Sequence, residues 1–356
     1  MARKIYSTQK LSKDEKIITA PFKKCQMMQE FDLITKFFKP LANKTVNSDN
    51  LENDTAFIDL KQSEHLILSK DLFVEDIHFL KSDGAYKIAS RLLLSNLSDL
   101  ASSGAEPLYY MLGFSKTNNT DASFVKEFAR GLSDIQKKYN ISLIGGDTVR
   151  SNKYFFSITI FGKTKKNKFL TRNQAKKGNL IYVSGNIGDA YFGLKINQQK
   201  KLNLDKDCQY LLDRYFFPNP QINLGKELVK RNLSRCAIDI SDGLLSDLNH
   251  ICTNSNLTAN IFLEQIPISN QLKRILNKKI DNEYLNIISA GDDYELIFVI
   301  DQKDQKKITY LADFLNIKLT NIGYFTGCND KSSLVNLFNN NKELKKIKIN
   351  KYGYEH

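Results

Sequence analysis

The sequence contains no tryptophan, only four histidines and only five cysteines in 356 residues, so it is poor in side chains that bind soft metals. The cysteines are odd in number, lie far apart and form no C-x-x-C pair: they are Cys25, Cys208, Cys236, Cys252 and Cys328. This spacing fits neither a zinc site nor a disulfide framework, and it indicates reduced thiols, as in the cytoplasm. A metal ion bound here would be a hard cation held by oxygen atoms.

Long apolar runs are absent as well. No segment reaches the length and apolarity that a bilayer-spanning helix needs. The first 28 residues are basic and have no apolar stretch of the kind found in a secretory signal. We therefore expect a basic tail over residues 1–28, no membrane segment and a cytoplasmic location.

Acidic residues are fewer than basic ones, which gives a formal net charge of +13. A charge of this size is compatible with nucleic-acid binding. However, the lysines are dispersed along the whole chain, and the densest stretch, residues 342–351, is interrupted by Leu344, Ile347 and Ile349. The pattern argues against a nucleic-acid interface and suits a phosphorylated, anionic substrate.

Strand-like and helix-like segments alternate along the chain. His65–Ser69 has the pattern of a strand, and Ala85–Ala101 that of a helix. In the second half, a predicted strand at Ala237–Ile240 leads into a helix at Gly243–Cys252. The alternation predicts a mixed α/β fold with helices packed on sheets. The length predicts two domains, 29–162 and 163–356, with the boundary at the basic stretch that follows residue 162.

Carboxylates recur where a strand ends or a helix begins, next to Gly, Ser or Thr. Taken singly, an Asp in such a place is usually a helix cap. The chain has a series of them: Asp71, Asp99, Asp147, Asp239, Asp242 and Asp292. Asp99 lies one helical turn after Asn96, so both side chains should face the same way. If the carboxylates converge, divalent cations must offset their repulsion, and Mg²⁺ prefers such oxygen ligands together with water and substrate phosphates.

Other catalytic signatures are missing. The sequence contains no G-x-x-x-x-G-K-[ST] phosphate loop, no H-E-x-x-H and no Ser-His-Asp or Cys-His arrangement. The glycines at 185, 188 and 193 have the wrong spacing for a dinucleotide-binding loop and indicate an ordinary strand-to-helix turn. The remaining hypothesis is phosphoryl transfer assisted by Mg²⁺.

A series of short motifs, in order along the chain, resembles the thiamine-monophosphate kinase family. That family belongs to a superfamily with aminoimidazole ribonucleotide synthetase and selenophosphate synthetase. The similarity runs from about residue 30 to the C-terminus. The main motifs are E-N-D-T-A at 52–56, S-K-D at 69–71, V-E-D-I-H-F at 74–79, N-L-S-D-L-A at 96–101, G-G-D-T at 145–148, D-I-S-D-G-L at 239–244, G-D-D-Y-E-L at 291–296 and G-Y-E-H at 353–356.

The resemblance implies a two-domain fold of the aminoimidazole ribonucleotide synthetase type. The N-terminal domain would bind Mg²⁺ and ATP, the C-terminal domain would complete the nucleotide and substrate sites, and the protein would form a homodimer through its N-terminal sheets. Catalysis would depend on Asp71, Asp99 and Asp147. Several Mg²⁺ ions would be held by a set of oxygen ligands: Asp54, Ser69, Asp71, Asp99, Asp147 and Asp239, with Asp242 on a further ion.

The same resemblance implies the positions of the two substrates. ATP, the co-substrate, would meet Gly146, Asp147, Arg172 and Ser241. The phosphate of thiamine monophosphate would lie near His78, and its thiamine moiety near Asp292 and Tyr354. A carboxylate and an aromatic ring both attract a cationic thiazolium.

Three positions depart from the usual pattern of the family. Asn53 replaces a carboxylate, Lys70 replaces a hydroxyl residue, and Gln221 replaces an arginine that often follows the P-x-P segment. The ammonium of Lys70 cannot ligate Mg²⁺ through its side chain. These changes bear on the number of bound ions and on the rate, rather than on the class of reaction.

Two alternatives remain open from the sequence. One is another ATP-dependent enzyme of the same superfamily, acting on a formylglycinamidine ribonucleotide or on selenide. The other is a basic protein without catalytic activity that binds nucleic acid. The histidine of V-E-D-I-H-F and the terminal G-Y-E-H favour thiamine monophosphate as the acceptor.

Overall fold

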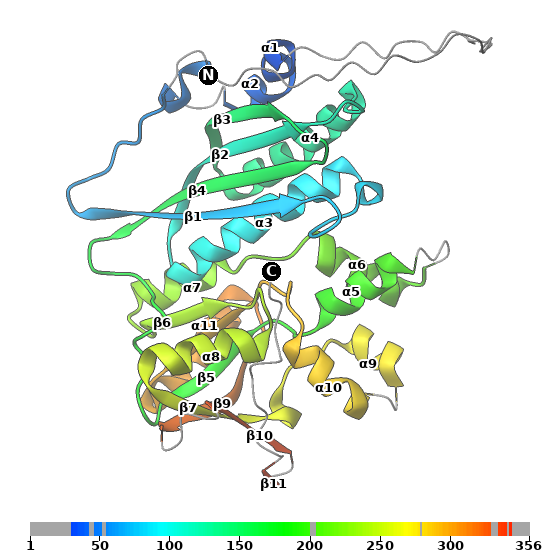
Figure 1. Cartoon of the computed structure of the whole chain (residues 1–356). Helices are drawn as coiled ribbons and strands as arrows, with labels where there is room; N and C mark the ends of the chain where they lie inside the picture. Colours follow the sequence, from blue (N-terminus) through cyan, green and yellow to red (C-terminus); the bar gives the residue numbers. More distant parts are fainter. Residues whose placement is uncertain are drawn as a thin grey trace, which may run out of the picture.

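The computed structural model describes residues 30–42, 46–51, 55–199, 204–277, 280–328, 334–339 and 342–343. The expected tail over residues 1–28 and two expected site residues, Asp54 and Tyr354, lie outside the described residues. The described chain forms two sheets, and each sheet is covered by helices (Figure 1). The two sheets correspond to an N-terminal and a C-terminal part of the chain.

The N-terminal sheet has four strands in the order β1-β4-β2-β3. Its strands are β1 (Glu64–Val74), β2 (Glu106–Lys116), β3 (Ser142–Arg150) and β4 (Phe155–Lys165). β2 and β3 are parallel, and the other neighbouring strands are antiparallel. Helices α3 (Ala85–Ser103) and α4 (Ala122–Tyr139) cover one face of this sheet, and α2 (Lys39–Ala42), which follows α1 (Glu30–Leu33), packs against β3 (Figure 1).

Helix α3 occupies the middle of the molecule. It begins after Gly84 and ends at Gly104, whose φ of +69° is the left-handed conformation that favours glycine at a helix end. Every residue from Ile88 to Leu94 is buried, because the helix lies between the N-terminal sheet and the second domain. The predicted helix over 85–101 is confirmed and extends two residues further.

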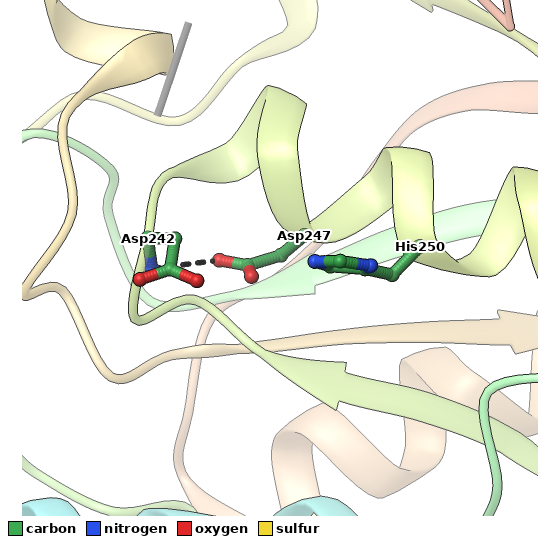
Figure 2. A group of neighbouring side chains, drawn as sticks. All are labelled: Asp242, Asp247 and His250. Atoms are coloured by element: carbon green, nitrogen blue, oxygen red, sulfur yellow. Dashed lines mark hydrogen bonds between the residues drawn. The ribbon is translucent and has the colours of Figure 1, made fainter. Parts of the chain in front are cut away.

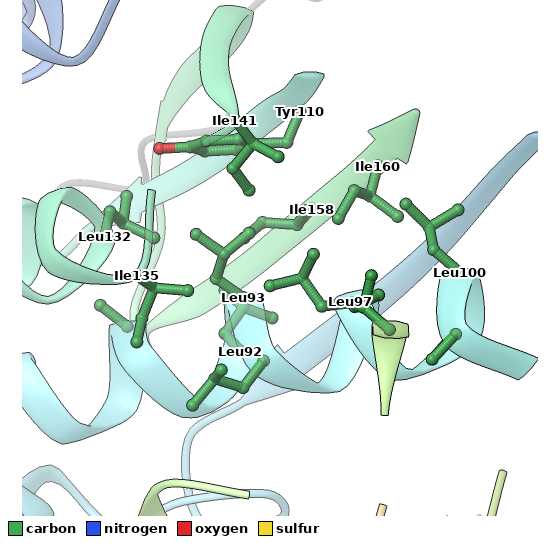
Figure 3. Close-up of a cluster of buried hydrophobic side chains, with 14 of the residues drawn as sticks. Leu92, Leu93, Leu97, Leu100, Tyr110, Leu132, Ile135, Ile141, Ile158 and Ile160 are labelled. Carbon is green, nitrogen blue, oxygen red and sulfur yellow. The ribbon is translucent and has the colours of Figure 1, made fainter. Parts of the chain in front are cut away.

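The N-terminal core lies between α3, α4 and the sheet. Figure 3 shows leucines of α3, among them Leu93 and Leu97, facing Ile158 and Ile160 of β4. The same buried cluster continues into the C-terminal domain through Phe298. The two domains therefore share this cluster, and the C-terminal domain has a second large cluster of its own.

The C-terminal sheet has seven strands in the order β11-β10-β7-β9-β5-β8-β6. Its strands are β5 (Leu180–Ser184), β6 (Cys236–Asp239), β7 (Leu257–Phe262), β8 (Leu296–Ile300), β9 (Leu319–Gly327), β10 (Val335–Asn339) and β11 (Lys342–Glu343). The helices of this part are α5 (Asp189–Gln198), α6 (Lys206–Phe216), α7 (Ile222–Lys230), α8 (Leu244–Ser255), α9 (Asn270–Leu276), α10 (Ile280–Ser289) and α11 (Gln305–Leu315). The predicted mixed α/β fold is confirmed.

The two domains are in close backbone contact where α7 crosses the C-terminal end of α3. A Cβ atom added to Gly225 of α7 would lie 2.1 Å from the carbonyl oxygen of Ala101, and one added to Gly104 would lie 2.9 Å from the carbonyl oxygen of Gly225. Only glycine allows the two backbones to approach this closely. This crossing fixes α3 relative to the C-terminal sheet.

The sheet runs past the point where the sequence placed the domain boundary. β4 ends at Lys165, because Lys163 and Lys165 pair with β1 opposite Leu66 and Glu64. Lys163 also forms an ion pair with Glu64, at 3.3 Å. The first residues of the basic stretch that follows residue 162 are therefore part of the N-terminal sheet. Within the described ranges, no helix is both long and apolar enough to cross a membrane.

Candidate functional site

A cavity of about 810 Å³ opens between the two domains. Residues of β1 and α3 line it from one side, and residues of α5, α6 and the turns before α8 and β8 line it from the other. The lining brings together seven of the residues expected from the sequence: Asp71, His78, Asp99, Asp239, Ser241, Asp242 and Asp292. These residues are separated by as many as 221 positions in the chain, so the fold itself assembles the group.

Helix α3 organises the carboxylates at the base of the cavity. Ser69 Oγ donates to Asp99 Oδ2 at 2.6 Å, and the backbone N–H of Asp71 donates to Asn96 Oδ1 at 3.2 Å. Asn96 and Asp99 therefore both face β1, as their spacing predicts. On the C-terminal side, Ser98 Oγ donates to Asp239 Oδ2 at 2.8 Å. The N-L-S-D segment thus holds the backbone of Asp71 in β1 and the carboxylate of Asp239 in β6.

The three carboxylates are close enough to affect each other's ionisation. Burial and the neighbouring Asp239 raise the pKa of Asp71 to about 6. Burial and Asp71 raise the pKa of Asp99 to about 7, and burial and Asp99 raise the pKa of Asp239 to about 7. Arg172 acts in the opposite direction on Asp99 and Asp239. The cluster is short of positive charge, and a cation placed among its oxygens would be strongly favoured.

Arg172 lies at a smaller hollow next to the main cavity. This hollow, of about 240 Å³, is lined by Ser69, Asp99, Thr171 and Arg172 among other residues. Asp99 is shared by both spaces. A ligand with an anionic part can therefore contact the guanidinium and the carboxylate cluster at once.

The turn before α8 and the first turns of that helix contain a second group of polar side chains, shown in Figure 2. Ligand atoms of Asp242, Asp247 and His250 all lie within 4.8 Å of one another. Asp247 Oδ2 accepts from the backbone N–H groups of Ser241, Asp242 and Gly243, each at 3.1 Å. Asp247 therefore serves to hold the turn that presents Ser241 and Asp242.

His78 and Asp292 meet at the other end of the cavity. His78 Nδ1 accepts from the backbone N–H of Val74 at 3.1 Å, and its ring stacks on Phe73 with centroids 5.5 Å apart. Asp292 Oδ1 is 2.5 Å from Nη2 of Arg91. Nη1 of the same arginine donates to the carbonyl oxygen of His78. The two residues expected at the acceptor are thus linked through one buried arginine.

Asp147 does not join the other carboxylates within one chain. It belongs to the edge strand β3, whereas Asp71 belongs to β1 at the opposite edge of the sheet. The pairing register places Asp147 in one row with the exposed Leu72, while Asp71 lies in the adjacent row, on the face that α3 covers. Asp147 is exposed, and its Oδ1 accepts from its neighbour Thr148 at 2.8 Å.

Gly146 has a packing role that the sequence did not reveal. A Cβ atom at this position would lie 2.0 Å from the carbonyl oxygen of Leu112 in the adjacent strand. The close approach of β2 and β3 therefore requires glycine here, whether or not the backbone also meets a nucleotide. Its expected contact with ATP stays a prediction.

Comparison with known proteins agrees with this architecture. A model of the AIR synthase related protein N-terminal domain matches residues 52–164, and a model of the corresponding C-terminal domain matches residues 176–336. The thiamine-monophosphate kinase of Buchnera aphidicola subsp. Schizaphis graminum is 40% identical over 330 residues, which cover 92% of this chain and 98% of that protein. The chain belongs to the thiamine-monophosphate kinase family.

Solved structures of the family share the fold. The thiamine-monophosphate kinase from Stenotrophomonas maltophilia K279a superposes with a TM-score of 0.74 at 31% identity, covering 83% of this chain and 91% of that one. A complex of AaThiL with AMPPCP and TMP superposes with a TM-score of 0.72 at 25% identity. The match covers 96% of this chain and 100% of that one. The expected two-domain fold of this superfamily is confirmed.

Several side chains at this thiamine-monophosphate kinase site were not expected from the sequence. They are Arg91, Ser98, Tyr215, Asp247 and His250. A signal for Arg91 was present, since it is the one charged side chain from Ile88 to Ser98, a run of the helix that is otherwise apolar or small and polar. Asp247 and His250 lie three residues apart in the first turns of α8, which places them on one helix face.

The role of Asp247 can be tested by substitution. Asp247→Ala removes the acceptor for three buried or half-buried backbone N–H groups, so we expect unfolding to become easier by roughly 1–3 kcal/mol. Hydrogen exchange at Ser241, Asp242 and Gly243 should accelerate, whereas the core amides of β4 should change far less. Asp247→Asn keeps an acceptor oxygen and is the matched control. Unchanged exchange in the alanine variant would contradict the anchoring role.

Proposed function

We propose that this protein catalyses the Mg²⁺-dependent transfer of the γ-phosphoryl group of ATP to thiamine monophosphate, giving thiamine diphosphate and ADP. The observation that carries the proposal is the convergence of Asp71, Asp99 and Asp239 on one interdomain cavity. The names of the relatives and the AaThiL complex with AMPPCP and TMP support the choice of substrates. We also propose that the enzyme acts in the cytoplasm, where its cysteines would stay reduced.

The residues present fit magnesium. Hard oxygen atoms of three crowded carboxylates, with the hydroxyl of Ser69 beside Asp99, form the kind of donor set that Mg²⁺ prefers. Asp71, Asp99, Asp239 and Ser69 would hold the ions at the base of the cavity, and Asp242 would hold a further one. Asp54 and Asp147 are assigned to the same set by the family resemblance. Bound Mg²⁺ offsets the charge of the carboxylates and of the nucleotide phosphates.

The residues of the chain would act mainly by positioning. Arg172 and Ser241 would meet the phosphates of ATP, since Arg172 lies at the hollow that shares Asp99 with the main cavity. Ser69 and Ser98 hold the carboxylates of Asp99 and Asp239 in place through their hydroxyl protons. The acceptor phosphate is already ionised, so no side chain has to remove a proton from it. Alignment of donor and acceptor would provide most of the rate enhancement.

The acceptor would occupy the end of the cavity formed by His78 and Asp292. His78 would face the phosphate of thiamine monophosphate, and the carboxylate of Asp292 would face the thiamine moiety, together with Tyr354 from outside the described residues. Asp292 and Tyr294 have positive φ angles of +70° and +50°, and both line the cavity. Strained backbone of this kind is typical of ligand-binding segments.

We further propose that the enzyme is a homodimer, formed by the free faces of two N-terminal sheets. This face exposes a set of large apolar side chains: Leu66, Leu68, Leu72, Met111 and Val149. Exposed apolar groups in such number are typical of a surface that pairs with another one. Within the described part of the chain, β1 and β3 are the edge strands of this sheet, and no further strand pairs with their outer sides. Pairing of β1 with β3 of the second subunit would bring the partner subunit's Asp147 toward Asp71.

The reaction is tested by measuring ADP release with three acceptors: thiamine monophosphate, formylglycinamidine ribonucleotide and selenide. We expect turnover with thiamine monophosphate alone, and a dependence on Mg²⁺ that EDTA abolishes. Asp71→Asn should lower kcat by roughly two orders of magnitude or more, because it removes a charge from the cluster. Asp121→Asn, at the N-cap of α4, is the matched control and should keep normal activity, since both residues cap helices well. Normal turnover in Asp71→Asn would refute the assigned role.

The dimer is tested by mixing two inactive variants. If each site combines Asp71 of one subunit with the partner subunit's Asp147, then Asp71→Ala and Asp147→Ala should complement each other. Random exchange of subunits would restore about a quarter of the wild-type activity, because half of the dimers are mixed and each mixed dimer has one intact site. Mixing without any recovery, while native mass spectrometry shows mixed dimers, would contradict a site shared between subunits.

A further inference from the structure

Arg91 is the most deeply buried cation among the residues that line the cavity. Its side chain is 5% exposed, and it projects from the middle of α3. Nη1 donates to the carbonyl oxygen of His78 at 2.7 Å and to the hydroxyl of Tyr215 at 3.0 Å, and Nη2 donates to Asp292 Oδ1 at 2.5 Å. One side chain thus connects α3, the turn after β1, helix α6 and the segment before β8.

Aromatic rings complete the surroundings of this guanidinium. Its central carbon lies 4.1 Å from the centroid of Tyr215 and 5.3 Å from that of Phe73. Phe73 in turn stacks on the ring of His78. The planar guanidinium is therefore held in a fixed orientation by the Tyr215 ring and by directional hydrogen bonds.

The charge of Arg91 is maintained in spite of its burial. Burial alone would lower the pKa of Arg91, but Asp292, together with Tyr215 and Tyr294, raises it, and the net direction is upward. The guanidinium therefore stays protonated. Among the residues that the structure describes, buried Arg91 Nε has no hydrogen-bond partner, whereas both terminal nitrogens of the group have one. A buried donor without an acceptor costs stability, so its presence calls for an explanation.

Asp292 depends on Arg91 for its link to the N-terminal domain. Its backbone N–H donates to Ser241, and the neighbouring residues are anchored within the C-terminal domain. Asp293 accepts from the N–H groups of Gly188 and Ala190, at 2.7 and 3.3 Å. Glu295 accepts from Ser184, Arg214 and Gln221. Among the described residues, the bond from Arg91 is the one that ties the Asp292 carboxylate to the other domain.

We propose that Arg91 is a positioning residue for the acceptor: it fixes the spacing between the His78 turn and Asp292 and so determines how tightly thiamine monophosphate binds. The proposal rests on the proposed function, and it goes beyond it by assigning a role to a residue outside the expected set. The contacts of Arg91 go to the acceptor end of the cavity, whereas Arg172 lies at the hollow beside Asp99. Loss of Arg91 should therefore affect the acceptor far more than ATP.

The experiment compares Arg91→Met and Arg91→Lys with the wild-type enzyme. We expect Arg91→Met to raise KM for thiamine monophosphate by roughly tenfold or more, while KM for ATP stays within about threefold. Arg91→Lys keeps the charge but loses the planar fork, so it should recover only part of the affinity. Calorimetric titration with thiamine monophosphate in the presence of AMPPCP and Mg²⁺ should give the same ranking of dissociation constants.

Two control variants separate positioning from general loss of stability. Tyr215→Phe removes one hydrogen bond from Arg91 but keeps the ring and the pair with Asp292, so it should raise KM for the acceptor by only about two- to fivefold. Gln136→Leu removes a buried side chain bonded to Tyr110 and to the backbone of Leu41 and Leu143, far from the cavity. It should lower the melting temperature without changing the ratio of the two KM values.

The outcomes are distinct. Equal changes in both KM values, or an unchanged KM for the acceptor in Arg91→Met, would overturn the positioning role while leaving the kinase activity established. If Arg91→Met does not fold, Arg91→Lys and Tyr215→Phe decide in the same way, and a selective rise in KM for the acceptor supports the proposal. A wild-type enzyme that fails to turn over thiamine monophosphate refutes the proposed function itself, and the inference falls with it.

Discussion

Repulsion between buried carboxylates is the constraint on which the structure depends. Asp71, Asp99 and Asp239 come from a strand, a helix and a second strand, and each raises the pKa of another. Such a group is unfavourable for folding unless hydrogen bonds and positive charge compensate it. Ser69 and Ser98 provide hydrogen bonds, and Arg172 provides part of the charge. The remaining deficit of positive charge is what divalent cations would supply.

Helix α3 links the carboxylate cluster to the packing of both domains. Its apolar side chains fill the shared core, while Asn96, Ser98 and Asp99 lie on the side that meets β1 and β6. Further toward its N-terminus, Arg91 reaches the acceptor end of the same cavity. At Gly225, α7 crosses this helix in close backbone contact, which packs it against the second domain. The groups that we propose to bind the two substrates are therefore positioned by one helix.

The sequence was informative wherever function depends on local pattern. The spacing of Asn96 and Asp99 predicted that both face one way, and the motifs around Asp71 and Asp239 predicted residues that the fold brings together. The class of fold also followed from the alternation of strands and helices. These predictions succeeded because helix periodicity and strand-end geometry are determined over a few residues.

Other features depend on contacts that no local pattern contains. Arg91 and Asp292 are 201 positions apart, and the sequence around either residue does not predict its contact with the other. The face on which Asp147 lies depends on the sheet order and on a register shift between Tyr110 and Met111, where β3 has one additional residue. A shift of one residue reverses the direction of every following side chain. The basic stretch at the predicted domain boundary begins with residues whose charged side chains do not reveal that their backbones pair in a strand, Lys163 and Lys165.

The central claim is that the clustered carboxylates hold divalent cations beside the nucleotide. Anomalous diffraction from a crystal soaked with Mn²⁺, AMPPCP and thiamine monophosphate tests it most directly. The account predicts anomalous peaks at coordination distance, about 2.1–2.3 Å, from oxygens of Asp71, Asp99 and Asp239. Nucleotide density in the cavity without any peak beside these three side chains would contradict it.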